Sequence, residues 1–542
     1  MKTPWFKNSI IYGVDIQTYM DSNGDGIGDF QGLINKLDYI ADLGVDCLWL
    51  LPFYTTPYRD NGYDIQDYFS VDSRVGGLQD FIELVQTANQ RGIRILIDLV
   101  MNHTSDQHPW FQASRRDPQS RYHDYYVWSK TPVEVPKEMG TIFPGEEESV
   151  WTFDEVAQAY FFHRFYHFEP ALTFSNPQVR EEAFRVMDFW LSFNISGFRL
   201  DAAPHMIEEK GLKGKKPEHP HQMLQAFHEF LKFRNPEAVF MAETDVPVEE
   251  IAKFFHGGKE MDMLFNFLLS EYLFLALATE KNENLVLLLN RLPSAPKAGQ
   301  WVNFLRNLDE LDLERLTEQE KQQVLDVFAP SRGMQIFGRG LRRRIAPMLG
   351  GDRRRMELAF SLLFSMPGIP MFVYGDEIGM GEDLSLSGRN AVRTPMQWST
   401  EKNAGFSSAS IQRLSRPVIT TGQFAYKKVN VADQLAHRTS FLKWMKNLIK
   451  IRKSKPVIGT GDFQVLDSSN PHVFAHAIHH ETDQAIFIHN LSDSPQSVEI
   501  ELPVPGHLLQ SIHGSGTYRR RSDGQMTIDL DPYGYLWLGQ GE

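Results

Sequence analysis

Short apolar runs alternate along the chain with longer stretches in which apolar residues recur every three or four positions. Gly32–Leu43 is the first such stretch, and this spacing predicts a helix with one buried face. The continuous apolar run Cys47–Leu51 instead predicts a strand buried on both faces. Leu78–Gln90 is predicted as the next helix and Ile93–Val100 as the next strand. Strands and helices in this alternation favour a parallel sheet with helical crossovers.

Eight strands are predicted for this sheet, the number that closes a (β/α)8 TIM barrel of the α/β class. They are Ile10–Ile16, Cys47–Leu51, Ile93–Val100, Gly197–Asp201, Val239–Glu243, Met263–Phe267, Val302–Asn307 and Ile369–Tyr374.

Two segments depart from this alternation and divide the chain into three domains. Residues 104–178 are aromatic, proline-dotted and irregular, which predicts an inserted domain B after the third strand. The barrel, domain A, then comprises residues 1–103 and 179–455, with a helix near Pro177–Phe193. From about residue 460 short apolar runs are separated by turns, which predicts a C-terminal all-β sandwich, domain C, over residues 456–542.

Charged and polar side chains stand at the predicted carboxyl ends of the barrel strands, where barrel active sites lie. Residues two apart on a strand face the same way, so Arg199 is expected to project beside Asp201 and to keep it ionised. The full set is Asp98, Asn102 and His103 after the third strand, Arg199 and Asp201 at the fourth, Glu243 at the fifth, and Asp309 after the seventh.

Carboxylates that meet at one barrel mouth suit cleavage of a glycosidic bond. One carboxylate attacks the anomeric carbon, and a second, kept protonated, donates to the leaving oxygen. Each acid taken alone is better explained as a strand cap or the partner of a base. Four such groups at successive strand ends favour an active site.

The motifs DLVMNH, GFRLD, MAET and RNLDE resemble, in order, the four main signature segments of glycoside hydrolase family 13, the α-amylase family. GVDCLWLLP, GYD and GDEIG resemble further segments of that family. Within it, DSNGDGIGDF, NHTSDQHPWF and VRTPMQW are most similar to the trehalose synthases, which interconvert maltose and trehalose. The resemblance covers the whole chain.

This resemblance implies a retaining mechanism through a covalent glycosyl-enzyme and gives each matching residue a role. The nucleophile is then Asp201, the general acid/base is Glu243, and the third acid, which binds sugar hydroxyls, is Asp309. The subsite for the cleaved sugar is then lined by Tyr63, Asp64, His103 and Arg199.

The segment DSNGDG at residues 21–26 matches D-x-N-x-D-G, the start of a calcium-binding loop. Calcium prefers hard oxygen ligands, and position 12, Gly32, lacks the glutamate of an EF-hand. The loop resembles the calcium loop of trehalose synthases and oligo-1,6-glucosidases; a solvated turn is the alternative. We expect one structural calcium and no organic cofactor, with the metal ligands Asp21, Asn23, Asp25, the Ile27 carbonyl and Asp29.

Two positions depart from the family pattern. The histidine expected before the third acid is Leu308. The enzyme is therefore slower on ordinary glucosides, or prefers a sugar altered at one hydroxyl, or is catalytically impaired. Where trehalose synthases carry QPDLN, this chain has Glu169-Pro170-Ala171-Leu172-Thr173. In the family that aspartate helps to bind a second calcium beside Asn102, so Ala171 predicts that this second site is lost.

Composition excludes some classes of protein. The 542 residues include 55 basic and 69 acidic side chains, a net charge of −14, which argues against nucleic acid as a partner. Cys47 is the single cysteine, so no intramolecular disulfide forms. We predict no export signal and no membrane span, and therefore a cytoplasmic protein, with a homo-oligomer possible. The basic runs at 339–344 and 351–355 are predicted to be solvated surface.

Two enzyme activities fit these patterns, and a third interpretation places the chain in another class of protein. The first activity is intramolecular α-glucosyl transfer of the trehalose synthase type on a small α-linked saccharide. The second is an α-glucosidase or transglucosylase that passes glucose to water or to another acceptor. The third interpretation is a catalytically impaired sugar-binding homologue. Because the chain retains all three carboxylates, this is the weakest of the three.

Overall fold

The structure, a computed structural model, describes residues 3–134, 139–481, 483–501, 509–520 and 525–540. Eight parallel strands close a barrel in the order β1-β16-β12-β11-β10-β9-β5-β2. This confirms the predicted TIM barrel and its eight strands. They are β1 (Ile11–Val14), β2 (Cys47–Leu50), β5 (Arg94–Leu99), β9 (Gly197–Leu200), β10 (Val239–Ala242), β11 (Met263–Phe265), β12 (Gln300–Phe304) and β16 (Ile369–Val373).

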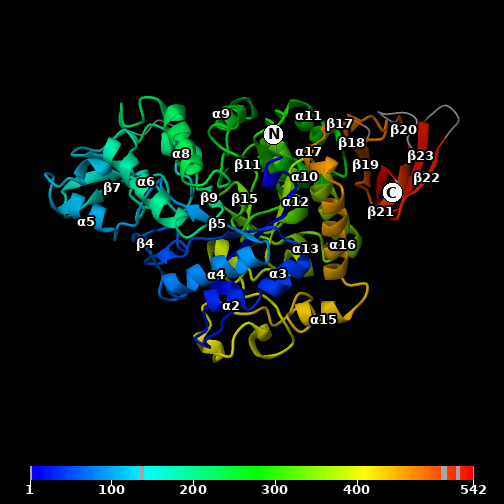
Figure 1. Cartoon of the computed structure of the whole chain (residues 1–542), viewed down its shortest axis with the longest axis horizontal. Coiled ribbons are helices and arrows are strands. Elements are labelled where there is room, and N and C mark those ends of the chain that lie inside the picture. Colours follow the sequence, from blue (N-terminus) through cyan, green and yellow to red (C-terminus); the bar gives the residue numbers. More distant parts are fainter. Residues whose placement is uncertain (1–2, 135–138, 482, 502–508, 521–524, 541–542) are drawn as a thin grey trace.

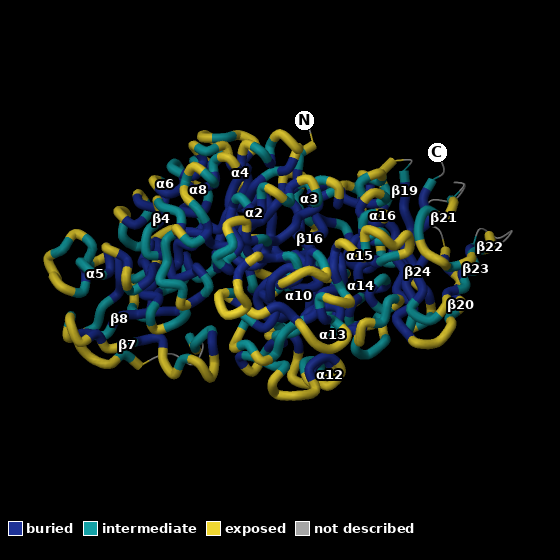
Figure 2. The backbone as a smooth tube through the Cα atoms, turned by 90° about the horizontal axis from the view of Figure 1, so that it is seen from below, coloured by how far each residue is buried: buried dark blue, intermediate teal, exposed yellow. Residues whose placement is uncertain are grey.

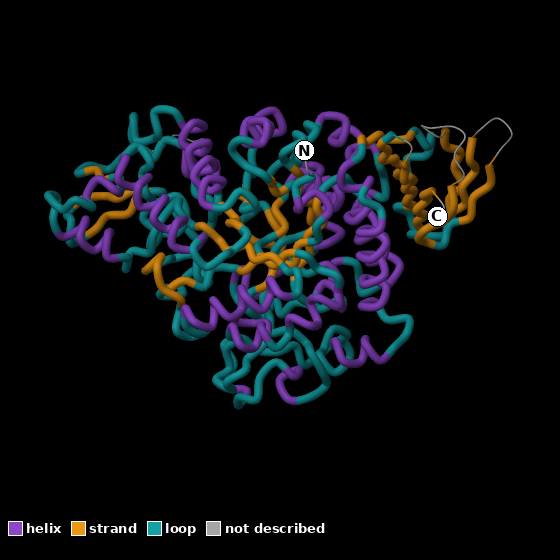
Figure 3. Tube along the Cα trace, viewed as in Figure 1, coloured by secondary structure: helices purple, strands orange, loops and turns teal. Residues whose placement is uncertain are grey.

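Helices surround the barrel strands, as Figure 3 shows by the purple tubes around the central orange ones. The predicted helix Gly32–Leu43 is two shorter helices, because the chain is not helical at Lys36. The helices are α1 (Ile16–Tyr19), α2 (Phe30–Ile34), α3 (Leu37–Leu43), α4 (Leu78–Gln90), α5 (Pro109–Arg116), α6 (Pro177–Leu191), α7 (Ala203–Ile207), α8 (Pro220–Arg234), α9 (Val248–Phe255), α10 (Phe267–Thr279), α11 (Glu283–Arg291), α12 (Glu318–Phe328), α13 (Ile345–Met348), α14 (Arg353–Ser365), α15 (Val431–Ala436), α16 (Phe441–Ser454) and α17 (Val457–Thr460).

The segment between β5 and α6 has a small sheet of its own, with order β6-β8-β7. Its strands are β6 (Trp128–Ser129), β7 (Trp151–Asp154) and β8 (Ala159–Phe162). A separate apolar cluster that includes Val127, Trp151 and Phe162 supports this sheet. In Figure 1 it lies, in cyan, at the opposite end of the long axis from the red C-terminal strands. This part of the insertion forms regular strands, whereas the sequence predicted irregular structure.

Short antiparallel pairs shape the loops at the barrel mouth. After β2 the chain forms β3 (Tyr54–Thr55) and β4 (Asp67–Val71). After β12 it forms the three-stranded sheet β13-β15-β14, whose strands are β13 (Leu311–Asp312), β14 (Gln335–Ile336) and β15 (Gly340–Leu341).

Two antiparallel sheets form the C-terminal region, in the orders β17-β18-β19-β24-β21 and β20-β23-β22. This confirms the predicted all-β domain. Alternate residues of β18 face opposite ways: Ala475 and Ala477 join the core between the sheets, whereas Phe474 and Ile478 pack with the barrel core. The strands are β17 (Asp462–Leu466), β18 (Val473–His480), β19 (Asp483–Asn490), β20 (Gln496–Glu501), β21 (Leu509–Gly514), β22 (Thr517–Arg520), β23 (Gln525–Leu530) and β24 (Tyr535–Gln540).

Burial is concentrated at the barrel, as the dark blue interior of Figure 2 shows, and exposed segments lie at its periphery. Among the described residues, no helix is both long and apolar enough to cross a membrane. The exact boundaries of the three domains stay a prediction.

Candidate active site

Arg199 of β9 joins three carboxyl groups at the carboxyl ends of neighbouring strands. Its Nη1 donates to Asp98 Oδ1 at 2.6 Å and to Asp201, and its Nη2 donates to Glu243 Oε2 at 2.5 Å. Strand register explains the contact with Asp98, because that residue is directly opposite Arg199 in the β5–β9 ladder. The guanidinium thereby holds Asp201 beside Glu243.

Asp98 supports Arg199 from below and does not line the active-site cavity that the described residues form. Its Oδ2 accepts a hydrogen bond from Trp49 Nε1 at 2.9 Å, and its side chain is fully buried. Burial raises the pKa of Asp98 to about 7, although the charge of Arg199 opposes this shift. Asp98 therefore orients the arginine that orients the two carboxyl groups above it.

Glu243 follows β10 and has a perturbed proton affinity. Burial, together with the charges of Asp201 and Asp309, raises its pKa to about 8, and the opposing charge of Arg199 does not cancel the shift. The carboxyl group is therefore protonated at neutral pH and can donate a proton. A protonated carboxyl beside a second carboxyl group is the arrangement that general acid catalysis with a nucleophile needs.

Asp309 follows β12 and has the opposite electrostatic environment. Burial alone would raise its pKa, but the positive charges of Arg389, Arg393 and Arg199 outweigh burial and lower it. Arg393 Nη2 lies 2.6 Å from Asp309 Oδ1, and Arg389 Nη1 lies 3.2 Å away. Asp309 is therefore an ionised acceptor, suited to bind sugar hydroxyls.

These groups surround a cavity of about 340 Å³ at the barrel mouth. The structure thus brings together Tyr63, His103, Arg199, Asp201, Glu243 and Asp309 of the predicted residues. The other lining residues come from the insertion and from the segments that follow β2, β9, β10, β11, β12 and β16: Asp60, Ile142, Phe143, Arg164, Phe165, Ala202, Pro204, His205, Asp245, Phe267, Asn307, Glu310, Asp312, Glu314, Arg315, Arg339 and Arg389.

His103 and Tyr63 form one side of this cavity. His103 Nε2 lies 3.2 Å from the Tyr63 carbonyl oxygen, and its Nδ1 has no hydrogen-bond partner among the described residues. Burial lowers the pKa of His103 to about 4, so its imidazole is neutral at physiological pH. Arg199 Nη1 lies 3.5 Å from the Tyr63 hydroxyl oxygen. His103 therefore lines the cavity as a neutral ring whose Nδ1 is itself buried.

Asp64 does not line the cavity that the described residues form. Its carboxylate is fully buried and accepts hydrogen bonds from Thr56 Oγ1 at 2.9 Å and from the Arg59 and Asp60 amides at 3.0 and 3.1 Å. Asp64 thus fixes the turn that presents Asp60, which does line the cavity. The sequence analysis missed Asp60, although it lies two residues before GYD.

Leu308 is 1% exposed and belongs to the hydrophobic core. It is absent from the described residues that line the cavity, whereas its neighbours Asn307 and Asp309 are present. Its carbonyl oxygen accepts a hydrogen bond from Arg393 Nε at 2.8 Å. The leucine therefore holds the backbone between two cavity residues without facing the substrate.

A lysine occupies the corner beside Asn102 where the family resemblance implies a second calcium. The Lys210 ammonium donates to Asn102 Oδ1 at 2.6 Å and to the His205 carbonyl oxygen. Its side chain is 1% exposed, and burial lowers the pKa of Lys210 to about 8. Ala171, also buried, offers no side-chain ligand. The corner thus contains a cation supplied by the chain.

The 21–29 loop is shaped by its own side-chain oxygens. Asp21 accepts from the amides of Asn23, Gly24 and Gly26 at 2.7–3.1 Å, and Asp25 accepts from the Ile27 amide at 2.8 Å. Asp29 caps α2 through the Gly32 amide at 2.7 Å. The three carboxylates do not bring oxygens within 4.8 Å of one another. Oxygen donors are the ligands that calcium prefers, and the calcium site stays a prediction.

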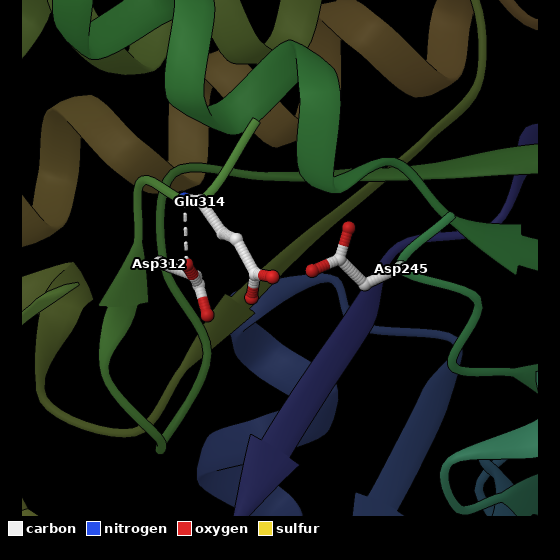
Figure 4. Close-up of side chains that lie close together, drawn as sticks. All are labelled: Asp245, Asp312 and Glu314. Atoms are coloured by element: carbon white, nitrogen blue, oxygen red, sulfur yellow. Dashed lines mark hydrogen bonds between the residues drawn. The ribbon is translucent and has the colours of Figure 1, made fainter. Parts of the chain in front are cut away.

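Three carboxylates that line the cavity lie close together. Oxygens of Asp245, Asp312 and Glu314 lie within 4.8 Å of one another, and Figure 4 shows these side chains directed toward a common point. Two arginines partner them: Arg315 Nε lies 2.7 Å from Asp245 Oδ1, and Arg339 Nε lies 2.7 Å from Asp312 Oδ2. This part of the cavity is rich in hydrogen-bonding groups rather than apolar, which suits a polyhydroxylated ligand.

The prediction that the first basic run, residues 339–344, is solvated surface was wrong. Arg344 is 1% exposed and donates to the carbonyl oxygens of Tyr374 and Val392, and Arg339 lines the cavity. Their guanidinium groups satisfy carbonyl and carboxylate oxygens that the loops leave unpaired.

Comparison with known proteins identifies the family. The model of the α-amylase catalytic domain matches residues 14–461, and that of the maltogenic amylase C-terminal domain matches residues 463–537. The chain belongs to the α-amylase family. It is an enzyme of this family, as the glycoside hydrolase resemblance predicted.

Individual relatives agree with this assignment. A trehalose synthase/amylase from Mycolicibacterium smegmatis is 40% identical over 99% of this chain and 92% of its own length. An oligo-1,6-glucosidase from Bacillus cereus is 30% identical over 91% and 92%. Among solved structures, the trehalulose synthase from Pseudomonas mesoacidophila superimposes with a TM-score of 0.80 at 25% identity, covering all of both chains.

Proposed function

We propose that this enzyme moves α-glucosyl units of short saccharides with retention of configuration, and that its principal reaction converts maltose and trehalose into each other. The observation that carries the proposal is the shared guanidinium of Arg199, which binds both Asp201 and Glu243. Retaining glycosidases place the two carboxyl groups ~5–5.5 Å apart, closer than the ~6.5–9.5 Å of inverting enzymes. Two carboxyls bound to one guanidinium fit the shorter spacing.

In the first step an oxygen of Asp201 attacks the anomeric carbon of the glucosyl unit. The glycosidic bond breaks, and Glu243 gives its proton to the leaving oxygen. The product is a glucosyl ester of Asp201 and a free glucose. Asp309, kept ionised by its arginines, accepts hydrogen bonds from hydroxyls of the bound glucosyl unit.

In the second step the anomeric hydroxyl of the retained glucose attacks the glucosyl ester. Its proton goes to Glu243, now a carboxylate, and Asp201 leaves. Two inversions at one carbon give net retention, so maltose yields trehalose and the reverse reaction uses the same groups. Attack by water at this stage gives two glucose molecules instead.

The second candidate is an α-glucosidase, which the 30% identity to oligo-1,6-glucosidases supports. One experiment separates the two. The enzyme is incubated with maltose, trehalose, sucrose and an aryl α-glucoside, and the products are followed by proton NMR. Trehalose formed from maltose is the expected result. Glucose alone would refute the isomerisation and leave the hydrolase. Absence of turnover, with Asp201→Asn binding sugars as the wild type does, would refute both.

We also propose one structural calcium in the 21–29 loop, with Asp21, Asn23, Asp25 and the Ile27 carbonyl as ligands and Asp29 bound through water. The ion neutralises the carboxylates and ties the loop after β1; no catalytic step uses it. A chelator should lower the melting temperature, and metal analysis should find one calcium per chain. An unchanged melting curve with no bound metal would contradict the site.

A further inference from the structure

Arg339 connects the insertion to the barrel at the rim of the cavity. Its Nη1 donates to the Ile142 carbonyl oxygen at 2.6 Å. Its Nε donates to Asp312 Oδ2 at 2.7 Å, and its Nη2 donates to Glu310 Oε1 at 3.2 Å. Each of its three guanidinium nitrogens thus has a different partner, and one of these partners belongs to the insertion, 197 residues away in sequence.

Aromatic packing reinforces the same connection. The ring of Phe143, next to Ile142, lies 4.8 Å from that of Phe337, next but one to Arg339. The guanidinium of Arg389 lies over both rings, at 5.1 and 5.6 Å. The insertion strip 142–143 and the barrel loop 337–339 therefore meet as one closing wall. Ile142, Phe143 and Arg339 all line the cavity.

We propose that Arg339 is a positioning residue that holds this closing wall against the barrel and thereby decides whether the glucosyl group goes to the retained sugar or to water. The inference rests on the proposed function. Arg339 touches neither Asp201 nor Glu243 in any hydrogen bond of the described residues, so it does not take part in bond breaking.

The physical reason is retention of the leaving glucose. A sugar held beside the glucosyl ester reacts as an intramolecular partner, with a large advantage over a free one. This advantage lasts only while the sugar stays in place and water is kept out. Arginine suits the task because its planar group fixes three acceptors at once, whereas lysine is a point charge without that rigid fork.

The test compares Arg339→Ala with Arg342→Ala. Arg342 is a matched control: it belongs to the same segment and donates to the carbonyl oxygens of Gly333, Leu384 and Leu386, but it is not among the described residues that line the cavity. Two quantities are measured. The first is the rate of nitrophenol release from a nitrophenyl α-glucoside, an aryl α-glucoside, which reports ester formation. The second is the ratio of trehalose to glucose formed from maltose.

We expect Arg339→Ala to lower the trehalose-to-glucose ratio about tenfold, through loss of the retained partner, and to change nitrophenol release less than about threefold. Arg342→Ala should leave both unchanged. Arg339→Lys, which keeps the charge and can make some of the contacts, should give an intermediate ratio. An unchanged ratio in Arg339→Ala, or an equal fall in nitrophenol release and trehalose formation, would overturn the proposal.

Amide hydrogen exchange separates this proposal from the proposed function. Exchange across residues 140–147 should rise in Arg339→Ala and not in Arg342→Ala, whichever saccharide the wild type accepts. A wild type that forms no trehalose refutes the isomerisation, and this exchange measurement still reports whether Arg339 holds the closing wall. Unchanged exchange in Arg339→Ala would contradict the role of Arg339 in holding the closing wall.

Discussion

The two sides of the cavity differ in how they are built. The catalytic side stands on barrel strands: Arg199, Asp201 and Glu243 follow or belong to neighbouring strands whose register fixes their positions. The closing side stands on loops, where Arg339 and Phe337 meet residues 142–143 of the insertion. Rigid strands carry the bond-breaking groups, and loops carry the contacts that hold the leaving sugar. Chemistry and product choice are therefore expected to respond to different substitutions.

The largest effect should come from the catalytic side. Glu243→Gln removes the proton donor, and turnover of maltose should fall ~10²–10⁴-fold. An aryl α-glucoside with a good leaving group needs less protonation, so its first step should lose much less. The comparison is made by steady-state kinetics on both substrates. Equal losses on the two would show that Glu243 acts by some means other than proton donation.

The raised pKa of Glu243 gives the catalytic side a pH signature. The protonated carboxyl is the active form in the first step, so kcat/KM for maltose should fall as pH rises through about 8. Below that pH the acid is present and activity is maintained. The fall approaches tenfold per pH unit once the acid is ionised. The Arg339→Ala variant should show the same limb, because the closing side does not hold this proton.

Lys210 tests whether the corner beside Asn102 uses a cation supplied by the chain. Lys210→Met keeps the length of the side chain and leaves Asn102 Oδ1 and the His205 carbonyl without their donor. Each buried unsatisfied group costs about 1–3 kcal/mol, so the free energy of unfolding should fall by that order.

Thermal unfolding measures this effect, with the exposed Lys213→Met as the control. Added calcium should not restore the stability of Lys210→Met, since Ala171 supplies no ligand. Recovery with calcium would show that the corner is a metal site after all.

Leu308 is the position where we expect the smallest change in activity, and its burial revises an expectation. The family pattern alone suggests that Leu308→His gains activity on plain glucosides. The side chain, however, is buried in the hydrophobic core, so a histidine there should cost about 1–3 kcal/mol for an unsatisfied polar group and leave the activity no higher. Leu308→Met, similar in volume, should cost less than about 1.5 kcal/mol. A gain in kcat/KM for Leu308→His would contradict this placement.

The barrel and the catalytic side could be predicted from the sequence because local signals specify them. Continuous apolar runs give the strands, and residues such as Asp201 and Glu243 follow those runs directly. The closing side could not, since it depends on contacts between distant loops. Nothing local distinguishes Arg339 from Arg342 in RGLRRR, although one lines the cavity and the other does not.

Long basic side chains were the most difficult to place for the same reason. Lys210 carries no motif, and its role depends on the absence of an aspartate at position 171, 39 residues earlier. Arg393 lies within the motif VRTPMQW, and Arg389 lies just before it. Closeness to a family motif was the only sequence feature that could have pointed to these two arginines. Their partner, Asp309, was identified, but the ion pairs that keep it ionised required the fold.

The central claim is that Asp201 forms a glucosyl ester with Glu243 as its acid and base. The most direct measurement is mass spectrometry of Glu243→Gln after incubation with an aryl α-glucoside that has a good leaving group. The first step proceeds without the acid, and the second step lacks its base, so the ester accumulates. We predict one glucosyl unit on the peptide that contains Asp201. A glucosyl unit on another residue, or none while nitrophenol is released in a burst, would contradict the account.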